Sequence, residues 1–470
     1  MVNMRYILIF CFSLIFFLPS KGQATLQQKL NGAMVSFAIN DAITGERITH
    51  YQSEVAITPA SITKLITTAS ALEILGADYR FRTYIEYDGT IQDSILNGNL
   101  YIRGTGDPTL GSDFIGDRNF MQTWTEAVRR AGIAKVTGNI VADASAYDDE
   151  GFNPRWTWLD VANYYASGIY GISINDNTLY LSFQTDAVGT TPVLFKTKPE
   201  DQNLIIDNQL RASKIDYDSA YIYGAPLCNT RILRGAIPAY RKTFVVRGDI
   251  PNPPQLLAQQ FKQALEENNI TVSGHETAIF TVSTTSRKQL YIHTSPALKE
   301  MIKIVNFQSN NHYAEHIFKH IAFVKTGVGT NDSAKRIIKS FWEQKGIDVS
   351  SFMQQDGSGL SRENTFTVKF LNEILLYMNT KSRYSEDFLA SLPQAGKDGT
   401  VRNILKNTRL QGCVQLKSGS MSHIQCYSGY INDGKHHYIF TVAVNNFSQP
   451  RSVVIKAIQQ WLLDSVTTTE

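Results

Sequence analysis

Three short clusters in the sequence contain side chains that could carry out nucleophilic chemistry. They are Ser61-Ile62-Thr63-Lys64, Ser309-Asn310-Asn311 and Lys417-Ser418-Gly419-Ser420. A serine hydroxyl becomes a nucleophile when a nearby base takes its proton, and an uncharged lysine amine can be that base. Together the clusters favour acyl transfer, in which a bond to a carbonyl carbon is broken through an intermediate held on serine.

The segment that carries the first cluster is expected to be a buried helix. Thr58 can cap it and Pro59 can be its first residue, which places Ser61 in the opening turn. Apolar side chains then recur at helical spacing, namely Ile62, Leu65, Ile66, Ala69 and Leu72. Lys64 follows Ser61 by three positions and therefore shares its face of the helix. Burial and a second ammonium group would both lower the pKa of Lys64, as a base requires.

The second cluster and the lysine of the third can complete the proton path. Ser309 would pass a proton to the leaving amine, and Asn311 would orient Lys64 and a substrate carbonyl. Lys417 is the natural second cation, and it could also bind a terminal carboxylate on the substrate.

The rest of the third cluster is expected on a strand beside the nucleophile. The backbone N–H groups of Ser61 and Ser420 would form an oxyanion hole. Ser418 and Gly419 would let a substrate backbone lie along this strand as an added edge.

Length and composition describe a globular protein of more than one domain. The chain has 470 residues, of which 43% are hydrophobic and 19% charged, and two or three domains are expected. The net charge of +3 gives no reason to expect a nucleic-acid partner. Cys11, Cys228, Cys413 and Cys426 are too few for a disulfide framework and lack metal-like spacing.

The first 22 residues read as a signal peptide. Arg5 is followed by an apolar run from Tyr6 to Leu18, which is too short to cross a bilayer. We expect residues 1–22 to be cleaved on export, with an uncleaved anchor as the alternative. No later segment has the length and apolarity of a transmembrane helix, so a soluble periplasmic protein is expected.

The order of the elements predicts a split catalytic domain with a long insertion. Strands are expected over residues 33–40 and 47–54, before the helix that carries Ser61. Short β-like runs then dominate, with one clear helix over 252–269. We therefore expect a catalytic domain from residues 23–85 and 288–470, and a β-rich accessory region over 86–287.

The combination of S-x-x-K, S-x-N and K-S-G resembles the motif set of penicillin-binding proteins and class A β-lactamases. Longer stretches make the resemblance specific, namely PASITKLITTASAL, GNLYIRGTGDPTL, FQSNNHYAEH, DGSGLSREN and LPQAGKDGTVR. With these the chain is identified as a member of the penicillin-binding protein 4 family of D-alanyl-D-alanine carboxypeptidases and endopeptidases, peptidase family S13. One departure is Ser418, where the family usually has threonine; serine keeps the hydroxyl donor.

The resemblance implies a fold, substrates and inhibitors. The fold would be α+β of the penicillin-binding protein and β-lactamase type, an antiparallel sheet flanked by helices. Substrates would be peptidoglycan stem peptides, and β-lactam antibiotics would acylate the serine. The family needs no metal or organic cofactor.

The resemblance also implies a pocket for the diaminopimelate side chain of the stem peptide. Asp160 would pair with its ammonium group and Arg362 with its carboxylate. The full set of residues that resemble this pocket is Trp158, Asp160, Tyr165, Arg362, Met421 and Ser422.

Three other functions remain open at this point. His312, Glu315 and His316 spell H-x-x-E-H, a pattern of zinc peptidases, with His320 one turn further on. A β-lactamase would need a general base for fast deacylation, and no dedicated glutamate loop is evident. A peptidoglycan-binding module without activity would not need the intact motif set.

Overall fold

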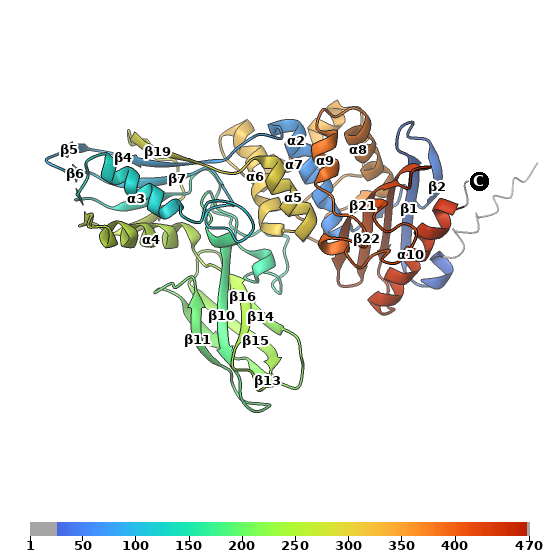
Figure 1. The fold of residues 1–470 in the computed structure, drawn as a ribbon, viewed down its shortest axis with the longest axis horizontal. Helices are drawn as coiled ribbons and strands as arrows, with labels where there is room; N and C mark the ends of the chain where they lie inside the picture. The colour runs from blue at the N-terminus through green and yellow to red at the C-terminus, as the bar shows by residue number, and fades with distance from the viewer. Residues whose placement is uncertain (1–25, 468–470) are drawn as a thin grey trace, which may run out of the picture.

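The computed structural model describes residues 26–467. The expected signal peptide, residues 1–22, lies outside this range. Among the described residues, no helix combines the length and the apolarity that a bilayer span requires. The molecule is elongated, with a helix-and-sheet region at one end and the inserted region at the other (Figure 1).

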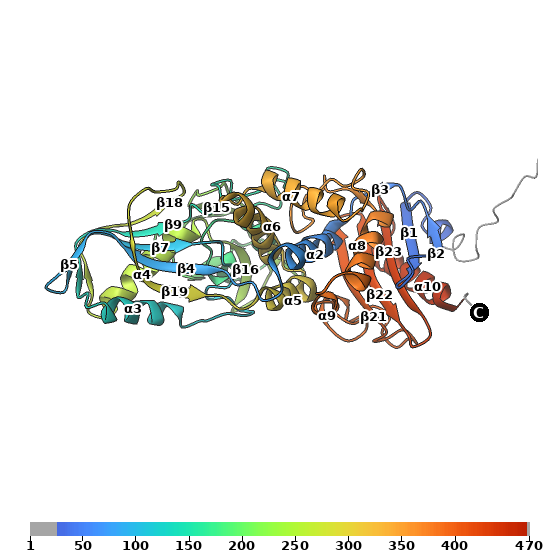
Figure 2. The same cartoon turned by 90° about the horizontal axis from the view of Figure 1, so that it is seen from above.

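A five-stranded antiparallel sheet forms the base of the helix-and-sheet region, in the order β2-β1-β23-β22-β21. The strands are β1 (Met34–Asp41), β2 (Arg47–Tyr51), β21 (Val414–Met421), β22 (Ile424–Asn432) and β23 (His437–Asn445). Alternate residues face opposite sides of a strand. Phe37 therefore packs on Trp461 of α10 (Arg451–Thr467), with ring centroids 4.7 Å apart, while Ala38 joins the helical core on the other face. Figure 2 shows α10 and α8 on opposite sides of this sheet.

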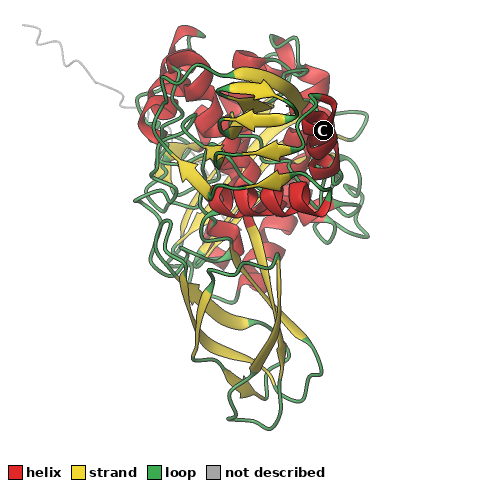
Figure 3. Cartoon of the chain, turned by 90° about the vertical axis from the view of Figure 1, so that its left-hand side faces the viewer, coloured by secondary structure: helices red, strands yellow, loops and turns green. Residues whose placement is uncertain are grey.

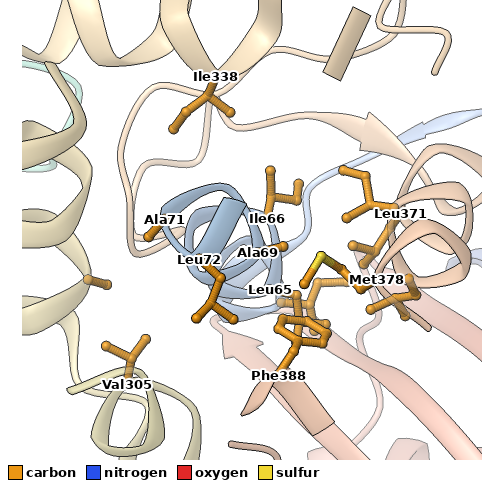
Figure 4. Packing of buried hydrophobic residues seen from close by; sticks show 14 of the residues in the cluster. Leu65, Ile66, Ala69, Ala71, Leu72, Val305, Ile338, Leu371, Met378 and Phe388 are labelled. Carbon is orange, nitrogen blue, oxygen red and sulfur yellow. The ribbon is translucent and has the colours of Figure 1, made fainter. Parts of the chain in front are cut away.

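Helix α2 (Thr63–Leu75) runs through the middle of the helical layer and is buried over most of its length. Its apolar side chains, among them Leu65, Ile66 and Leu72, meet residues from the surrounding helices (Figure 4). The surrounding helices are α5 (Leu298–Gln308), α6 (Asn311–Thr326), α7 (Asn331–Gln344), α8 (Val368–Thr380) and α9 (Ser385–Ala390). Small β3 (Ala56–Ile57) and β20 (Phe366–Thr367) pair beside them. Burial on every side explains why this helix lacks a polar face.

The start of this helix differs from the sequence prediction. Thr58 does not cap it; its N–H donates instead to Asn445 Oδ1 over 2.9 Å. A short 3-10 turn, η1 (Ala60–Ile62), carries Ser61 ahead of α2. Ala60 has a φ of 49°, a left-handed value that a non-glycine residue adopts only when its surroundings enforce it.

The first lobe of the inserted region is a mixed sheet covered by helices. Five strands lie in the order β18-β9-β7-β4-β19, next to a smaller sheet β17-β8-β6-β5. The strands are β4 (Arg82–Tyr87), β5 (Thr90–Gln92), β6 (Ile95–Asn97), β7 (Leu100–Gly104), β8 (Lys135–Val136), β9 (Ile140–Asp143), β17 (Thr271–Val272), β18 (Glu276–Ile279) and β19 (Lys288–Thr294). Helices α3 (Phe120–Arg130) and α4 (Pro253–Glu267) share a buried core with the sheets.

A second, all-β lobe projects sideways from the first (Figures 1 and 3). It holds a three-stranded sheet, β11-β10-β16, and a second sheet in which β15 pairs with β12, β13 and β14. The strands are β10 (Thr178–Gln184), β11 (Val193–Lys198), β12 (Ile205–Asn208), β13 (Arg211–Ser213), β14 (Ser219–Tyr223), β15 (Thr230–Pro238) and β16 (Phe244–Asp249).

The chain enters the inserted region from the helix-and-sheet region and returns to it through one pair of strands, β4 and β19. Arg82 is the cross-strand partner of Thr294. Just outside this pair, the N–H of Phe81 donates to Ser295 Oγ over 2.9 Å, and the N–H of Ser295 donates to the Phe81 carbonyl over 3.1 Å. We call the Arg82–Thr294 pair, together with the two hydrogen bonds between Phe81 and Ser295, the neck. The boundaries expected from the sequence, 85/86 and 287/288, fall on the insertion side of it, so they assign β19 to the catalytic domain although it pairs in the inserted sheet.

Candidate active site

The turn that carries Ser61 is enclosed between two glycines from distant parts of the chain. A Cβ on Gly359 would lie 2.0 Å from the carbonyl oxygen of Ala60, and Gly359 has a φ of +80°. On the other side, a Cβ on Gly419 would lie 2.5 Å from the Pro59 carbonyl and 3.1 Å from the Ser61 nitrogen. Strand β21 and the loop 356–361 can therefore approach the turn this closely only because they have no side chain there.

Lys64 is fully buried and its Nζ has three oxygen neighbours. Nζ lies 3.0 Å from Ser61 Oγ, 2.6 Å from Asn311 Oδ1 and 2.6 Å from the carbonyl oxygen of Ser358. Burial lowers the pKa of Lys64 to about 7, against the opposing effect of two nearby carboxylates, Glu315 and Asp356. The amine is therefore substantially uncharged at neutral pH, in contact with the hydroxyl it would deprotonate.

Lys417 on β21 contacts the serine of the second cluster. Its Nζ donates to Ser309 Oγ and to the Ser418 carbonyl, each over 2.8 Å. Burial, with the charge of Lys64 as a smaller contribution, holds the pKa of Lys417 well below its usual value. Ser309 ends α5 in a left-handed conformation, immediately before α6 begins at Asn311. The expected set of two lysines, two serines and an asparagine thus lies together.

The remaining residues of the third cluster follow along the edge of the sheet. Strand β21 is the last strand of the sheet and pairs with β22 on one side. The hydroxyl of Ser418 lies 2.9 Å from Thr400 Oγ1, and the hydroxyl of Ser420 donates to Gln425 Oε1 over 3.1 Å. The edge of β21 beside Ser61 can accept another extended chain.

A cavity of about 540 Å³ opens over Ser61 and is lined by both regions of the protein. Five of the six residues expected to form a side-chain pocket line it, namely Asp160, Tyr165, Arg362, Met421 and Ser422. Trp158 does not; its side chain is 73% exposed and lies 6.2 Å from the Tyr223 ring. The sequence prediction missed Thr157, Leu159, Tyr221, Gly359 and Leu360, which also line the cavity. Tyr221 lies in an aromatic-dense stretch, but only the fold brings that stretch to Ser61.

Asp160 and Arg362, the two charged residues that line this cavity, differ in the hydrogen bonds that they make within the protein. Asp160 accepts hydrogen bonds from Thr157 Oγ1 over 2.6 Å and from the Tyr165 hydroxyl over 3.3 Å. The Arg362 guanidinium has no hydrogen bond or ion pair to any described residue. It is therefore the more available of the two for a ligand of opposite charge.

In the H-x-x-E-H pattern of α6, the rings of His312 and His316 lie 4.4 Å apart, but each is hydrogen-bonded elsewhere and Glu315 is directed away from them. The His312 ring lies 2.9 Å from Ser173 Oγ, and His316 Nδ1 lies 2.9 Å from the Gly106 carbonyl, both in the inserted region. Glu315 accepts hydrogen bonds from the loop 356–361 instead. Within residues 26–467 no three His, Cys, Asp or Glu side chains are arranged to hold a metal ion.

Comparison with known proteins agrees with this geometry. A model of the D-Ala-D-Ala carboxypeptidase 3 (S13) family matches residues 22–464. A D-alanyl-D-alanine carboxypeptidase from Actinomadura sp. (strain R39) is 28% identical, over 91% of this chain and 80% of that protein. The D-alanyl-D-alanine carboxypeptidase DacB of Haemophilus influenzae is 24% identical, over 93% and 92% of the two chains.

The fold has a close counterpart among solved structures. The crystal structure of penicillin-binding protein 4 from Haemophilus influenzae superposes with a TM-score of 0.82 at 21% sequence identity, covering 93% of this chain and 98% of that one. This confirms the expected α+β fold with a large insertion. The match to the family model extends over nearly the whole described chain, and the protein therefore belongs to the D-Ala-D-Ala carboxypeptidase 3 (S13) family of serine-type carboxypeptidases.

Proposed function

We propose that the protein cleaves the terminal D-Ala from peptidoglycan stem peptides through an acyl-enzyme on Ser61, with Lys64 as the base. The observation that carries this proposal is the contact of 3.0 Å between Lys64 Nζ and Ser61 Oγ in a buried site, where the pKa of Lys64 is about 7. An ordinary lysine, with a pKa near 10.5, would be protonated and unable to accept the serine proton.

Acylation begins when neutral Lys64 takes the proton from Ser61 as Oγ attacks the carbonyl carbon of the penultimate D-Ala. The oxyanion of the tetrahedral intermediate accepts hydrogen bonds from the N–H groups of Ser61 and Ser420, each worth about 3–4 kcal/mol in the transition state. When the C–N bond breaks, Ser309 passes a proton to the leaving amine. Its contact with Lys417 gives that proton a route from the buried amines.

Deacylation uses the same groups in reverse. Water attacks the ester carbonyl, gives its proton to the amine of Lys64, and releases the shortened peptide as Ser61 recovers its hydrogen. An amine of a second stem peptide is the leaving group when the cleaved bond is a cross-link. A DD-endopeptidase activity would therefore need no further catalytic group.

The substrate would be held along β21 as an added strand, with its terminal carboxylate near Lys417 and Ser418. Its side chain would enter the cavity between Asp160 and Arg362. A side chain that ends in both an ammonium and a carboxylate, as in diaminopimelate, matches this pair of opposite charges.

β-Lactam antibiotics would acylate Ser61 and remain attached. A structural relative is described in complex with a novel β-lactam. Rapid β-lactam hydrolysis would need a carboxylate placed to activate water, and Asp160 is the one acid among the described residues that line the cavity. Because Asp160 is engaged by Thr157 and Tyr165, we favour a penicillin-sensitive peptidase over a β-lactamase. We place this enzyme in the periplasm, after removal of residues 1–22.

The deciding experiment is mass spectrometry of the protein after incubation with benzylpenicillin. One adduct of the mass of the intact drug should form, and peptide mapping should place it on Ser61. The Ser61→Ala variant should remain unlabelled and should have an unchanged circular dichroism spectrum. An adduct on another residue would exclude Ser61 as the nucleophile, and an absence of labelling on the folded wild type would contradict the mechanism.

A further inference from the structure

Glu315 is a buried acid that the proposed reaction does not use, although a single residue, Ser358, connects it to the base. Its side chain is on α6, four residues after Asn311, and the residue is 2% exposed. One carboxylate oxygen accepts the N–H of Gly357 over 2.9 Å and the other accepts the N–H of Ser358 over 2.7 Å. The carbonyl of Ser358 in turn accepts from Lys64 over 2.6 Å.

A second carboxylate, that of Asp356 at the start of the loop 356–361, binds other N–H groups of the same loop. The N–H groups of Gly359 and Ser361 donate to this carboxylate over 2.7 and 2.5 Å. Trp156 of the inserted region also donates to it, through Nε1 over 2.9 Å. The Ser358 carbonyl therefore projects from a loop whose backbone N–H groups are bound by two buried carboxylates, only one of which comes from another element.

The position of this carbonyl decides where the lone pair of Lys64 points. A protonated Nζ has three hydrogens and three acceptors, on Ser61, Asn311 and Ser358. Carbonyl and amide oxygens can only accept hydrogen bonds, whereas a serine hydroxyl can also donate. After Nζ loses one proton, its two remaining hydrogens stay on Asn311 and Ser358, and its lone pair faces the hydroxyl of Ser61.

We propose that Glu315 is a positioning residue for this chemistry: by fixing the Ser358 carbonyl it directs the uncharged amine of Lys64 at Ser61. The inference rests on the proposed function, in which Lys64 is the base. It also assigns a role to the acid of the H-x-x-E-H pattern that involves no metal. A neutral or shorter side chain at this position leaves one of the two loop N–H groups without its acceptor.

Glu315 also acts on Lys64 through its charge. The charged groups that face Lys64 are Glu315 on α6, Asp356 in the loop and Lys417 on β21. The two carboxylates raise the pKa of Lys64 and oppose the effect of burial. Burial and the neighbouring Asp356 raise the pKa of Glu315 itself, whereas its hydrogen bonds from the N–H groups of Gly357 and Ser358 lower it and favour the ionised form that acts on Lys64.

The test is the rate constant of penicillin acylation as a function of pH, for wild type and two variants. Glu315→Gln keeps the shape but removes the charge and one acceptor. Its maximal rate should fall by about ten- to a hundredfold, the cost of a misplaced catalytic group. The acidic limb of its pH–rate profile should move to lower pH, because loss of a neighbouring negative charge lowers the pKa of Lys64. Glu315→Asp keeps the charge, but its side chain is too short to reach both N–H groups. Its maximal acylation rate should therefore fall, while the acidic limb of its pH–rate profile stays at the wild-type pH.

Asp176 provides a matched control. It is a buried carboxylate, 7% exposed, that accepts hydrogen bonds from Ser112 Oγ over 2.6 Å and from the N–H of Asp113 over 2.8 Å, with no contact to Lys64. Asp176→Asn should leave the acidic limb in place, whatever it does to stability. A general loss of stability would alter both variants alike, and melting temperatures and the fraction that binds penicillin correct for it.

The acylation rates and pH profiles of the Glu315 variants either support or overturn the positioning role. A folded Glu315→Gln protein with the wild-type limb, or with the wild-type maximal rate, overturns the positioning role. If that variant does not fold, Glu315→Asp decides alone: a wild-type rate overturns the role and a lowered rate with an unmoved limb supports it. Failure of the wild type to be acylated at Ser61 would instead refute the proposed function, so the two failures are distinguishable.

Discussion

The side-chain amide of Asn311 donates to the main-chain carbonyl of Tyr165 over 2.7 Å, and this bond joins the inserted region to the proposed catalytic residues. Asn311 also accepts from Lys64 through its other amide atom. Tyr165 lines the substrate cavity and its hydroxyl bonds to Asp160. A single asparagine therefore links the base to the wall that would recognise the substrate side chain.

The buried lysine should make activity and stability respond to pH in a defined way. Acylation needs the uncharged amine, so its rate should rise as pH increases through about 7, the pKa of Lys64. Lys64 binds fewer protons in the folded state than in the unfolded state between about pH 7 and the usual lysine pKa near 10.5, so its contribution to the free energy of unfolding should increase over that interval. Below pH 7 the lysine is charged in both states and its burial destabilises the fold.

Lys64→Met should separate these two effects. The variant should lose acylation, because the base is absent, yet unfold at a higher temperature than wild type at pH 6. Thermal unfolding monitored by circular dichroism, with penicillin labelling in parallel, measures both. A lower melting temperature at pH 6 would show that the three hydrogen bonds of Lys64 outweigh the cost of burying its charge.

Gly359→Ala should displace the nucleophile turn. Gly359 and Gly346 have the same φ of +80°, so alanine is strained to a similar degree at either position. Only at Gly359 would the new Cβ meet another atom, the Ala60 carbonyl at 2.0 Å; around Gly346 there is none within 4 Å. Gly346→Ala should cost about 1–2 kcal/mol of stability and keep its acylation rate. Gly359→Ala should also lose at least about tenfold in that rate, and equal rates in the two variants would contradict the close contact.

Arg362→Ala should reduce kcat/KM for peptides with a diaminopimelate side chain and spare simple acyl-D-Ala-D-Ala. The expected loss is about tenfold to a hundredfold, as for a charge-assisted hydrogen bond of roughly 1.5–3 kcal/mol. Trp158→Ala is the matched control, because that side chain lies outside the cavity. Equal losses on both substrates would remove Arg362 from side-chain recognition, and a selective loss in Trp158→Ala would return that residue to the pocket.

Chelation should leave acylation and peptide cleavage unchanged. Glu315 and His316 are directed to different partners, the loop 356–361 and the Gly106 carbonyl. Prolonged treatment with a strong chelator, followed by assay with and without added Zn²⁺, checks this expectation. Loss of activity that Zn²⁺ restores would support the metallopeptidase alternative.

The sequence predicted those features that depend on local spacing. The order of the three clusters indicated the family, and the apolar period of residues 62–72 indicated the buried helix, since both can be read along the chain. The 3-10 turn at Ser61 could not be predicted, because its conformation is imposed by Gly359 and Gly419, which are remote in sequence. For the same reason Tyr221 was not identified as part of the site, and Glu315 was noted only as the acid of the H-x-x-E-H pattern.

Helix α3 (Phe120–Arg130) was not predicted from the sequence, and the reason is different. Phe120, Trp124 and Val128 recur every four residues and are buried, so the helical period was present in the sequence. The surrounding β-like texture of the inserted region concealed it. At the neck, the boundaries expected from the sequence fall inside β4, at 85/86, and at the first residue of β19, at 287/288. The pairing of these two strands joins residues far apart in the chain, so it could not be read from local texture.

The neck has a consequence for engineering this enzyme. Because Arg82 and Thr294 face one another across a strand pair, their Cα atoms are only about 5 Å apart, close enough for a tight turn to bridge them. A shortened polypeptide running from Phe81 through such a turn to Ser295 would dispense with both accessory lobes at a single graft point, and with them the Tyr165 side of the cleft. The selectivity of such a truncated hydrolase among peptide substrates would then depend on Arg362 and β21 alone.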